Sequence, residues 1–120
     1  MTKSTVLISD FYQKQMEFGY LQSFNLYRNL SGIGSSEYTL KITSCDYPLY
    51  EGNQKFLITF LGVRNLKIRD FEGLFKLIIT IDDISKDQIE GINYKVIEEE
   101  YETFSFICEK FEFEIIQNII

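Results

Sequence analysis

The segment 91–116 constrains the fold of this chain most, because apolar and polar residues alternate along it with the period of a β-strand. A single antiparallel register brings all of its apolar partners onto one face. The expected pairs are Val96 with Phe104, Tyr94 with Phe106 and Ile92 with Cys108. The sequence therefore predicts an antiparallel hairpin with one buried face.

The connection of this hairpin is strongly acidic, reading Glu98, Glu99, Glu100, Tyr101 and Glu102. The whole chain has 18 acidic and 12 basic residues, a formal net charge of −6. Residues 1–60 hold five of each sign, whereas residues 61–120 hold thirteen acids and seven bases. Such a field repels phosphate backbones, so we expect no direct nucleic-acid binding. It favours a basic protein partner, or serves only to keep the protein soluble.

The rest of the chain reads mainly as further short strands. Ser9 or Asp10 is placed to cap one helix of about two turns, and Gly19 to end it. The nearly all-apolar segment 55–63 is typical of a central strand covered on both faces. The other expected strands are 24–30, 38–43, 65–70 and 74–81.

Two geometries are open after Cys108. A two-residue turn at Glu109-Lys110 would place Phe106 opposite Phe113, but Glu-Lys is poor turn chemistry. A bulge at the same place would instead flip the strand parity. With either geometry the sequence predicts a mainly β single domain over residues 1–120. The architecture expected is an antiparallel β-sandwich or a curved, partly closed barrel of about seven or eight strands, with one short N-terminal helix.

The chain lacks histidine, which removes histidine bases and every histidine-containing metal site. Asp82-Asp83 is the most enzyme-like pair, but adjacent strand residues point to opposite faces, which favours a solvated strand end. Gly32-Ile33-Gly34 is typical of a loop and lacks the remaining glycine of a dinucleotide-binding motif. Tyr47-Pro48 is a candidate cis peptide bond. We therefore expect no enzymatic activity, no cofactor and no metal.

Cellular location follows from what the chain lacks. Two cysteines, Cys45 and Cys108, are too few for a disulfide framework and read as small buried hydrophobes. The N-terminal apolar run is too short for a secretory signal, and no run approaches the roughly 20 residues of a membrane span. We expect a cytoplasmic protein with no membrane partner.

Two segments resemble the small acidic immunity proteins that bacteria encode beside polymorphic toxins. The first is the F-x-G-V-x-x-L element at residues 60–66. The second is a Y-x-V…E…F-x-C…F-x-I-like run near the end of the chain, comprising Tyr94, Val96, Glu100, Phe106, Cys108, Phe113 and Ile115. The resemblance spans most of the chain from Phe18 onward.

This resemblance implies a protein that binds one cognate toxin and occludes its active site. The acidic patch would meet the basic substrate channel of the toxin, with Tyr101 as an aromatic anchor. The expected contact residues are Glu98, Glu99, Glu100, Tyr101, Glu102, Asp82 and Asp83. Two other classes stay open: a phage-type inhibitor of a host defence protein, and a homo-oligomeric structural or ligand-binding β-domain. In the latter, the apolar C-terminal segment 115–120 would form the interface of a homodimer.

Overall fold

The computed structural model describes residues 3–28, 30, 37–47, 52–69, 76–87, 91–100 and 102–117. Gly32 to Gly34, Pro48 and Tyr101 lie outside these residues, so the expectations placed on them are not addressed. The elements are α1 (Lys3–Gln15), β1 (Tyr20–Arg28), β2 (Tyr38–Cys45), β3 (Gln54–Ile68), β4 (Ile79–Asp83), the 3₁₀ turn η1 (Ser85–Asp87), β5 (Tyr94–Glu98), β6 (Phe104–Cys108) and β7 (Lys110–Gln117).

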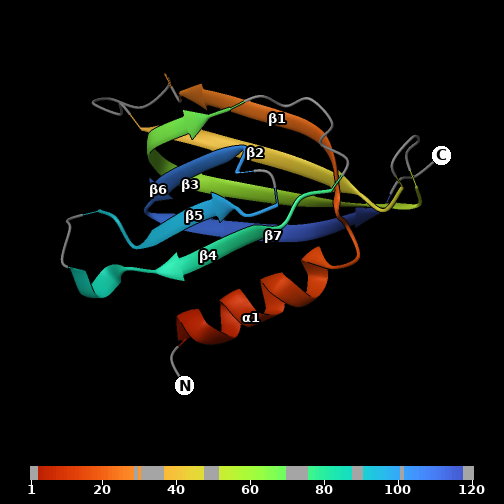
Figure 1. Ribbon diagram of the computed structural model, residues 1–120, viewed down its shortest axis with the longest axis horizontal. Coiled ribbons are helices and arrows are strands. Elements are labelled where there is room, and N and C mark those ends of the chain that lie inside the picture. The colour runs from red at the N-terminus through yellow and green to blue at the C-terminus, as the bar shows by residue number, and fades with distance from the viewer. Residues whose placement is uncertain are drawn as a thin grey trace.

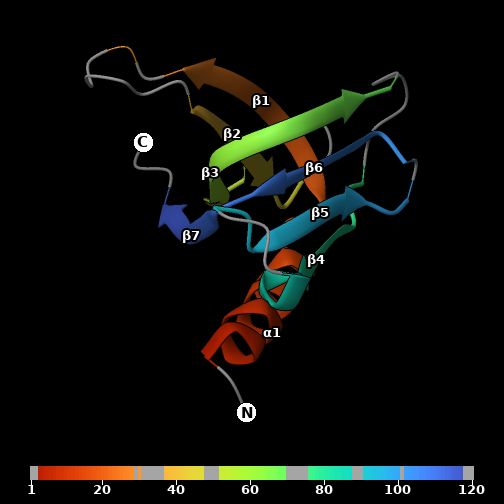
Figure 2. The ribbon, with the colours of Figure 1, turned by 90° about the vertical axis from the view of Figure 1, so that its left-hand side faces the viewer.

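The described strands form one antiparallel sheet of seven, in the order β1-β2-β3-β6-β5-β4, with β7 also paired with β3. The sheet is strongly curved but not closed into a barrel, and α1 lies beside β4 (Figures 1 and 2). The prediction of a mainly antiparallel β fold with one N-terminal helix is confirmed. The sequence predicted either a sandwich or a curved, partly closed barrel, and the structure shows one curved sheet that is not closed into a barrel.

Strand β3 is the central strand of the sheet and pairs with three others. Its first part pairs with β2 on one side and β7 on the other, and its last part pairs with β6. The segments 55–63 and 65–70, predicted as separate strands, are therefore largely one bent strand that ends at Ile68. Phe56, Ile58 and Phe60 are buried, whereas the residues between them are only half-buried. The prediction of a strand covered on both faces was wrong, because only the concave face receives α1 and the far strands.

Strands β6 and β7 run one after the other along the same edge of β3. Leu61 pairs with Lys110 and Arg64 with Ile107, so no hairpin forms between β6 and β7. Cys108 and Phe111 are both buried, which means that one extra residue sits between two inward positions. The bulge geometry is therefore observed. The alternative two-residue turn, with Phe106 opposite Phe113, is absent because each strand keeps its hydrogen bonds to β3.

The β5–β6 hairpin has the predicted direction and buried face, but its register differs by two residues. Tyr94 pairs with Cys108 and Val96 with Phe106. A shift of two preserves the alternation of side chains, so every predicted apolar residue of the hairpin still faces the core. The predicted pairs were wrong because Glu98 remains in β5 instead of starting the connection.

Helix α1 starts six residues before the predicted cap and has thirteen residues. Ser9 and Asp10 lie inside it, and the Asp10 carboxylate accepts a hydrogen bond of 2.6 Å from Lys14 one turn later. The predicted start was wrong because Leu7 and Ile8 extend the apolar side of the helix and pack against the core. Phe11 is fully buried among Phe56, Phe111 and Phe113, with ring centroids 5.6–6.0 Å away.

Two side chains of α1 form hydrogen bonds with backbone groups at the outer edge of β4. The Tyr12 hydroxyl accepts a hydrogen bond from Ile81 N–H (2.9 Å) and donates to Ile81 C=O (3.0 Å). Gln15 makes the same reciprocal pair with the backbone of Ile79, at 2.7 and 3.0 Å. The helix thereby takes the place of a neighbouring strand and blocks an edge open to strand addition. This contact fixes the β4 end of the curved sheet.

The core is made largely of aromatic and β-branched side chains from all of these elements. Phe104, Phe106 and Phe111 are buried and Phe113 is half-buried, as expected of a packed aromatic stripe. The predicted strand 74–81 is shorter than expected, since β4 begins only at Ile79. Among the described residues, no helix has the length and apolarity required to cross a membrane.

Candidate partner-binding surface

Glu98 lies inside the fold, where it organises the β5–β6 turn. Its side chain has no exposed surface. One carboxylate oxygen accepts hydrogen bonds from the backbone N–H groups of Ile78 (3.1 Å) and Glu100 (2.8 Å). The other oxygen accepts a longer one from Thr103 N–H (3.4 Å). Glu98 therefore holds the turn from within and offers no surface to a partner.

The other described glutamates of the turn are exposed. Glu99 donates its backbone N–H to Ile78 C=O at 2.7 Å, which ties the turn to the start of β4. Glu102 adopts a positive φ of 52° and forms an ion pair of 3.3 Å with Arg69. The strand ends at Glu98, so the glutamates that follow it do not continue the alternation of β5. Glu99, Glu100 and Glu102 instead form an exposed acidic turn.

Asp82 and Asp83 lie at the far end of β4. Asp82 is opposite Lys95 in the strand register, whereas Glu98 is opposite Ile79. Three residues of strand separate the two places, roughly 10 Å. Asp83 accepts hydrogen bonds from the backbone N–H and the hydroxyl of Ser85, at 2.9 and 2.6 Å. The pair therefore forms a strand end with a local turn, apart from the acidic turn.

Carboxylates from both acidic places affect the pKa of Tyr12. Burial raises the pKa of its hydroxyl above the usual 10.0, and the hydrogen bond with Ile81 opposes that rise. The negative charges of Asp82 and Glu99 raise the pKa further. Both carboxylates therefore act on the same hydroxyl, at the place where α1 meets β4.

A hollow of about 360 Å³ lies beside the acidic turn, on the convex face of the sheet. Three basic side chains line it together with two glutamates of the turn. The charged residues are Lys67, Arg69, Lys95, Glu99 and Glu102, and the remaining ones are Ile97, Phe104 and Ser105. Sequence reasoning missed the basic residues because they come from two separate segments, residues 67–69 and residue 95, within the more acidic half of the chain.

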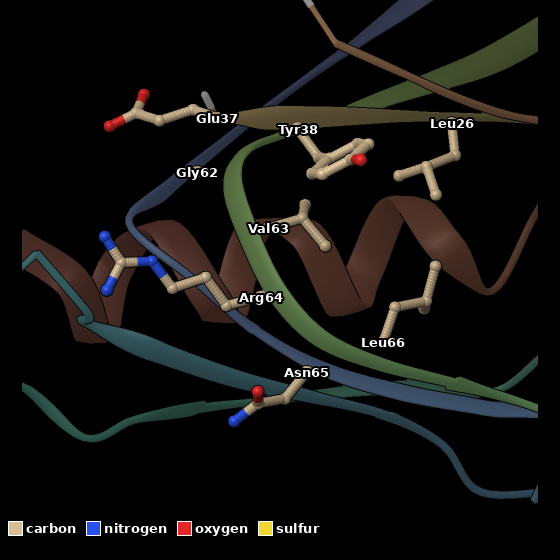
Figure 3. A pocket seen from close by; sticks show the side chains of 8 residues that line it. All are labelled: Leu26, Glu37, Tyr38, Gly62, Val63, Arg64, Asn65 and Leu66. Carbon is tan, nitrogen blue, oxygen red and sulfur yellow. The ribbon is translucent and has the colours of Figure 1, made fainter. Parts of the chain in front are cut away.

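A second, larger groove of about 460 Å³ opens on the concave side, where β3 bends away from β2. Figure 3 shows Leu26, Tyr38 and Leu66 around one end of it, with Glu37 and Arg64 at the other. Its apolar side chains are partly exposed because the sheet does not close at this place.

The F-x-G-V-x-x-L element supplies the bend. Gly62 has a φ of +70° and Asn65 a φ of +55°, a left-handed conformation that favours glycine and asparagine. A Cβ atom at Gly62 would lie 2.9 Å from Cβ of Glu109, the residue at the bulge between β6 and β7. Glycine is therefore required where β3 lies against the bulge between β6 and β7.

The cysteines are separate, buried thiols. Burial raises the pKa of Cys108 to about 12, so its thiol is protonated at neutral pH. Protonated thiols are poor nucleophiles. In the described ranges, no three histidine, cysteine, aspartate or glutamate side chains are grouped so as to hold a metal ion.

Comparison with protein families gives a match over nearly the whole chain. The family model of immunity protein PIM8 matches residues 4–114. No curated protein and no solved structure matches this chain significantly. The matched range contains all of the helix except Lys3, the bend of β3, the acidic turn and β7 up to Glu114. The chain belongs to the PIM8 family of immunity proteins.

Proposed function

We propose that this protein neutralises a cognate protein toxin in the cytoplasm of the producing cell, by binding the toxin and covering its active site. The observation that carries the proposal is the family match over residues 4–114. Neutralisation by binding alone requires no catalytic group in the immunity protein, which agrees with the chemistry of a chain without histidine.

The contact surface proposed is the acidic turn, with Asp82 and Asp83 as a second acidic place and Tyr101 as an aromatic anchor. Glu99, Glu100 and Glu102 are exposed, and the hydrogen bonds of Glu98 hold the turn in a defined shape. A preorganised turn loses less conformational freedom on binding than a loose one. Acidic side chains also accelerate association with a basic toxin by roughly 10- to 1000-fold at low salt.

The alternative role, self-association, would use the C-terminal segment. The side chains of Ile115 and Ile116 at the end of β7 are 36% and 41% exposed, so two large apolar residues face solvent there. The two readings involve different surfaces, because β7 belongs to the other part of the sheet from the acidic turn. A homodimer through β7 would therefore leave the acidic turn free to bind the toxin.

The test uses the toxin encoded beside this chain, prepared as a catalytically inactive variant. The variant E99K/E100K reverses two exposed charges, and E112K/E114K makes the same change on β7 as a matched control. We expect E99K/E100K to lower the association rate at least about 10-fold at low salt, and the control to leave it near wild type. In cells producing active toxin, the same variant should protect growth less well than the control.

Absence of binding between the wild-type protein and this toxin would contradict the proposed function itself. Equal association rates for wild type and E99K/E100K, over a range of salt concentrations, would contradict only the assignment of the surface.

A further inference from the structure

The hollow beside the acidic turn lies on one outward face of β3, β6 and β5. Lys67 pairs with Ser105, and Ser105 pairs with Ile97, so these three side chains form a row across the strands. Lys95 lies two residues from Ile97 along β5 and therefore points to the same face. The intervening Val96 is fully buried, which places this row on the side away from the core.

The positive charges around the hollow are only partly compensated within the protein. Arg69 forms its ion pair with Glu102, and both side chains are more than 70% exposed. Lys67 and Lys95 are exposed, and neither makes an ion pair in the part of the chain that the structure describes. Lys95 lies opposite Asp82 in register, yet no contact short enough for an ion pair joins them. A chain with net charge −6 thus presents, beside its acidic turn, two ammonium groups without an ion-pair partner among the described residues.

We propose that this hollow receives a carboxylate side chain of the toxin, between Lys67 and Lys95. The inference rests on the proposed function and specifies its chemistry: the docking surface carries both signs of charge. The complementary toxin surface is an acidic side chain flanked by basic ones, which face Glu99 and Glu102. The half-buried Ile97 supplies an apolar wall, and removal of water beside it strengthens the two ion pairs.

A nucleic-acid backbone fits the hollow less well than a single carboxylate. Double-stranded DNA carries one negative charge per roughly 1.7 Å of its axis, so phosphates next to a bound one would approach the surrounding acids. Glu99 and Glu102 lie in the same hollow as the lysines. An isolated acidic side chain on a protein avoids this repulsion and matches the alternating charges.

The test compares two double charge reversals in binding to the inactive toxin encoded beside this chain. The variant K67E/K95E changes the hollow, and K86E/K110E makes the same change in charge on η1 and β7. Circular dichroism and thermal unfolding establish that each variant is folded. K67Q/K95Q, which only neutralises the two charges, replaces the first variant if that one does not fold. A double-stranded DNA of about 20 base pairs is the polyanion probe.

We expect K67E/K95E to raise the Kd for the toxin by at least about 30-fold, K86E/K110E to change it less than about 3-fold, and the DNA to show no binding. The inference is overturned if K67E/K95E binds as wild type does, or if both variants lose affinity equally, which would report net charge alone. DNA binding by the wild type that K67E/K95E abolishes would also overturn it. In these three cases wild-type binding to the toxin would persist, so the proposed function would stand. Failure of the wild type to bind the toxin would overturn both.

Discussion

Replacement of Glu98 by alanine should destabilise the protein more than any other single substitution in the acidic connection. The side chain has no exposed surface, and its carboxylate accepts hydrogen bonds from three backbone N–H groups of two different segments. Glu98→Ala leaves those N–H groups without their acceptor and leaves a cavity behind. The turn and the start of β4 would then lose the group that connects them.

The expected loss of unfolding free energy follows from the geometry. Hydrogen bonds to a charged group contribute about 1.5–3 kcal/mol each. The two bonds near 3 Å count fully, whereas the bond from Thr103 at 3.4 Å is weak. Removal of a buried charge relieves part of its desolvation cost, which offsets some of this sum. We therefore expect a loss of about 3 kcal/mol.

Urea unfolding followed by circular dichroism measures this loss. With a slope of about 1.5 kcal/mol per M, the midpoint should fall by about 2 M urea. Glu99→Ala is the matched control, because it removes a glutamate one residue away whose side chain is exposed. It should change the free energy of unfolding by less than about 0.5 kcal/mol. Midpoints for the two variants that agree within error would refute the structural role assigned to Glu98.

Two further predictions concern the titrating groups of the interior. Tyr12→Phe removes both hydrogen bonds to Ile81 and should cost about 1–2 kcal/mol at pH 7. Since the pKa of Tyr12 is raised in the folded state, the unfolded state loses a proton first above pH 10.0, and wild-type stability falls there. The difference between wild type and Tyr12→Phe should therefore narrow between pH 9 and pH 11 in urea titrations; a constant difference would contradict the raised pKa. The fully buried Cys108, with a pKa of about 12, should react with a thiol-specific disulfide reagent at pH 8 only after unfolding, and rapid labelling of Cys108 in native Cys45→Ala protein would contradict its burial.

Alternation along the strands was sufficient to predict the fold class and the buried face. Val96, Phe104 and Phe106 are buried as their spacing indicated, because side chains of a strand alternate between faces whatever the partner. The register was not predictable in the same way, since shifts of two residues bury the same side chains. The start of α1 was missed because a polar cap at Ser9 or Asp10 competes with the packing of Leu7 and Ile8, and packing decided the outcome.

The candidate surface was predicted only in part. Glu99, Glu100 and Glu102 are exposed on the turn, but Glu98 is buried and Asp82 and Asp83 lie elsewhere. Alternation places Glu98 on the inward side with Tyr94 and Val96 only if the strand continues through it, and the residue types alone do not show that it does. Its position follows from the pairing of β5 with both β4 and β6, which brings Ile78 and Thr103 within hydrogen-bond reach of the same carboxylate.

The sequence by itself determined the class of fold, the inward apolar residues of the β5–β6 hairpin, the acidic character of its connection and the absence of histidine chemistry. These are local properties, since they depend on residue type and spacing alone. Only the tertiary structure decided the bend of β3 at Gly62 and the hydrogen bonds of Tyr12 and Gln15 to the edge of β4. It also decided which lysines line the hollow beside the acidic turn. Lys67 and Lys95 are 28 positions apart in the chain, and they lie on one face because β6 pairs with both β3 and β5. Long-range strand pairing creates that proximity, and neither the spacing nor the type of the two lysines specifies it.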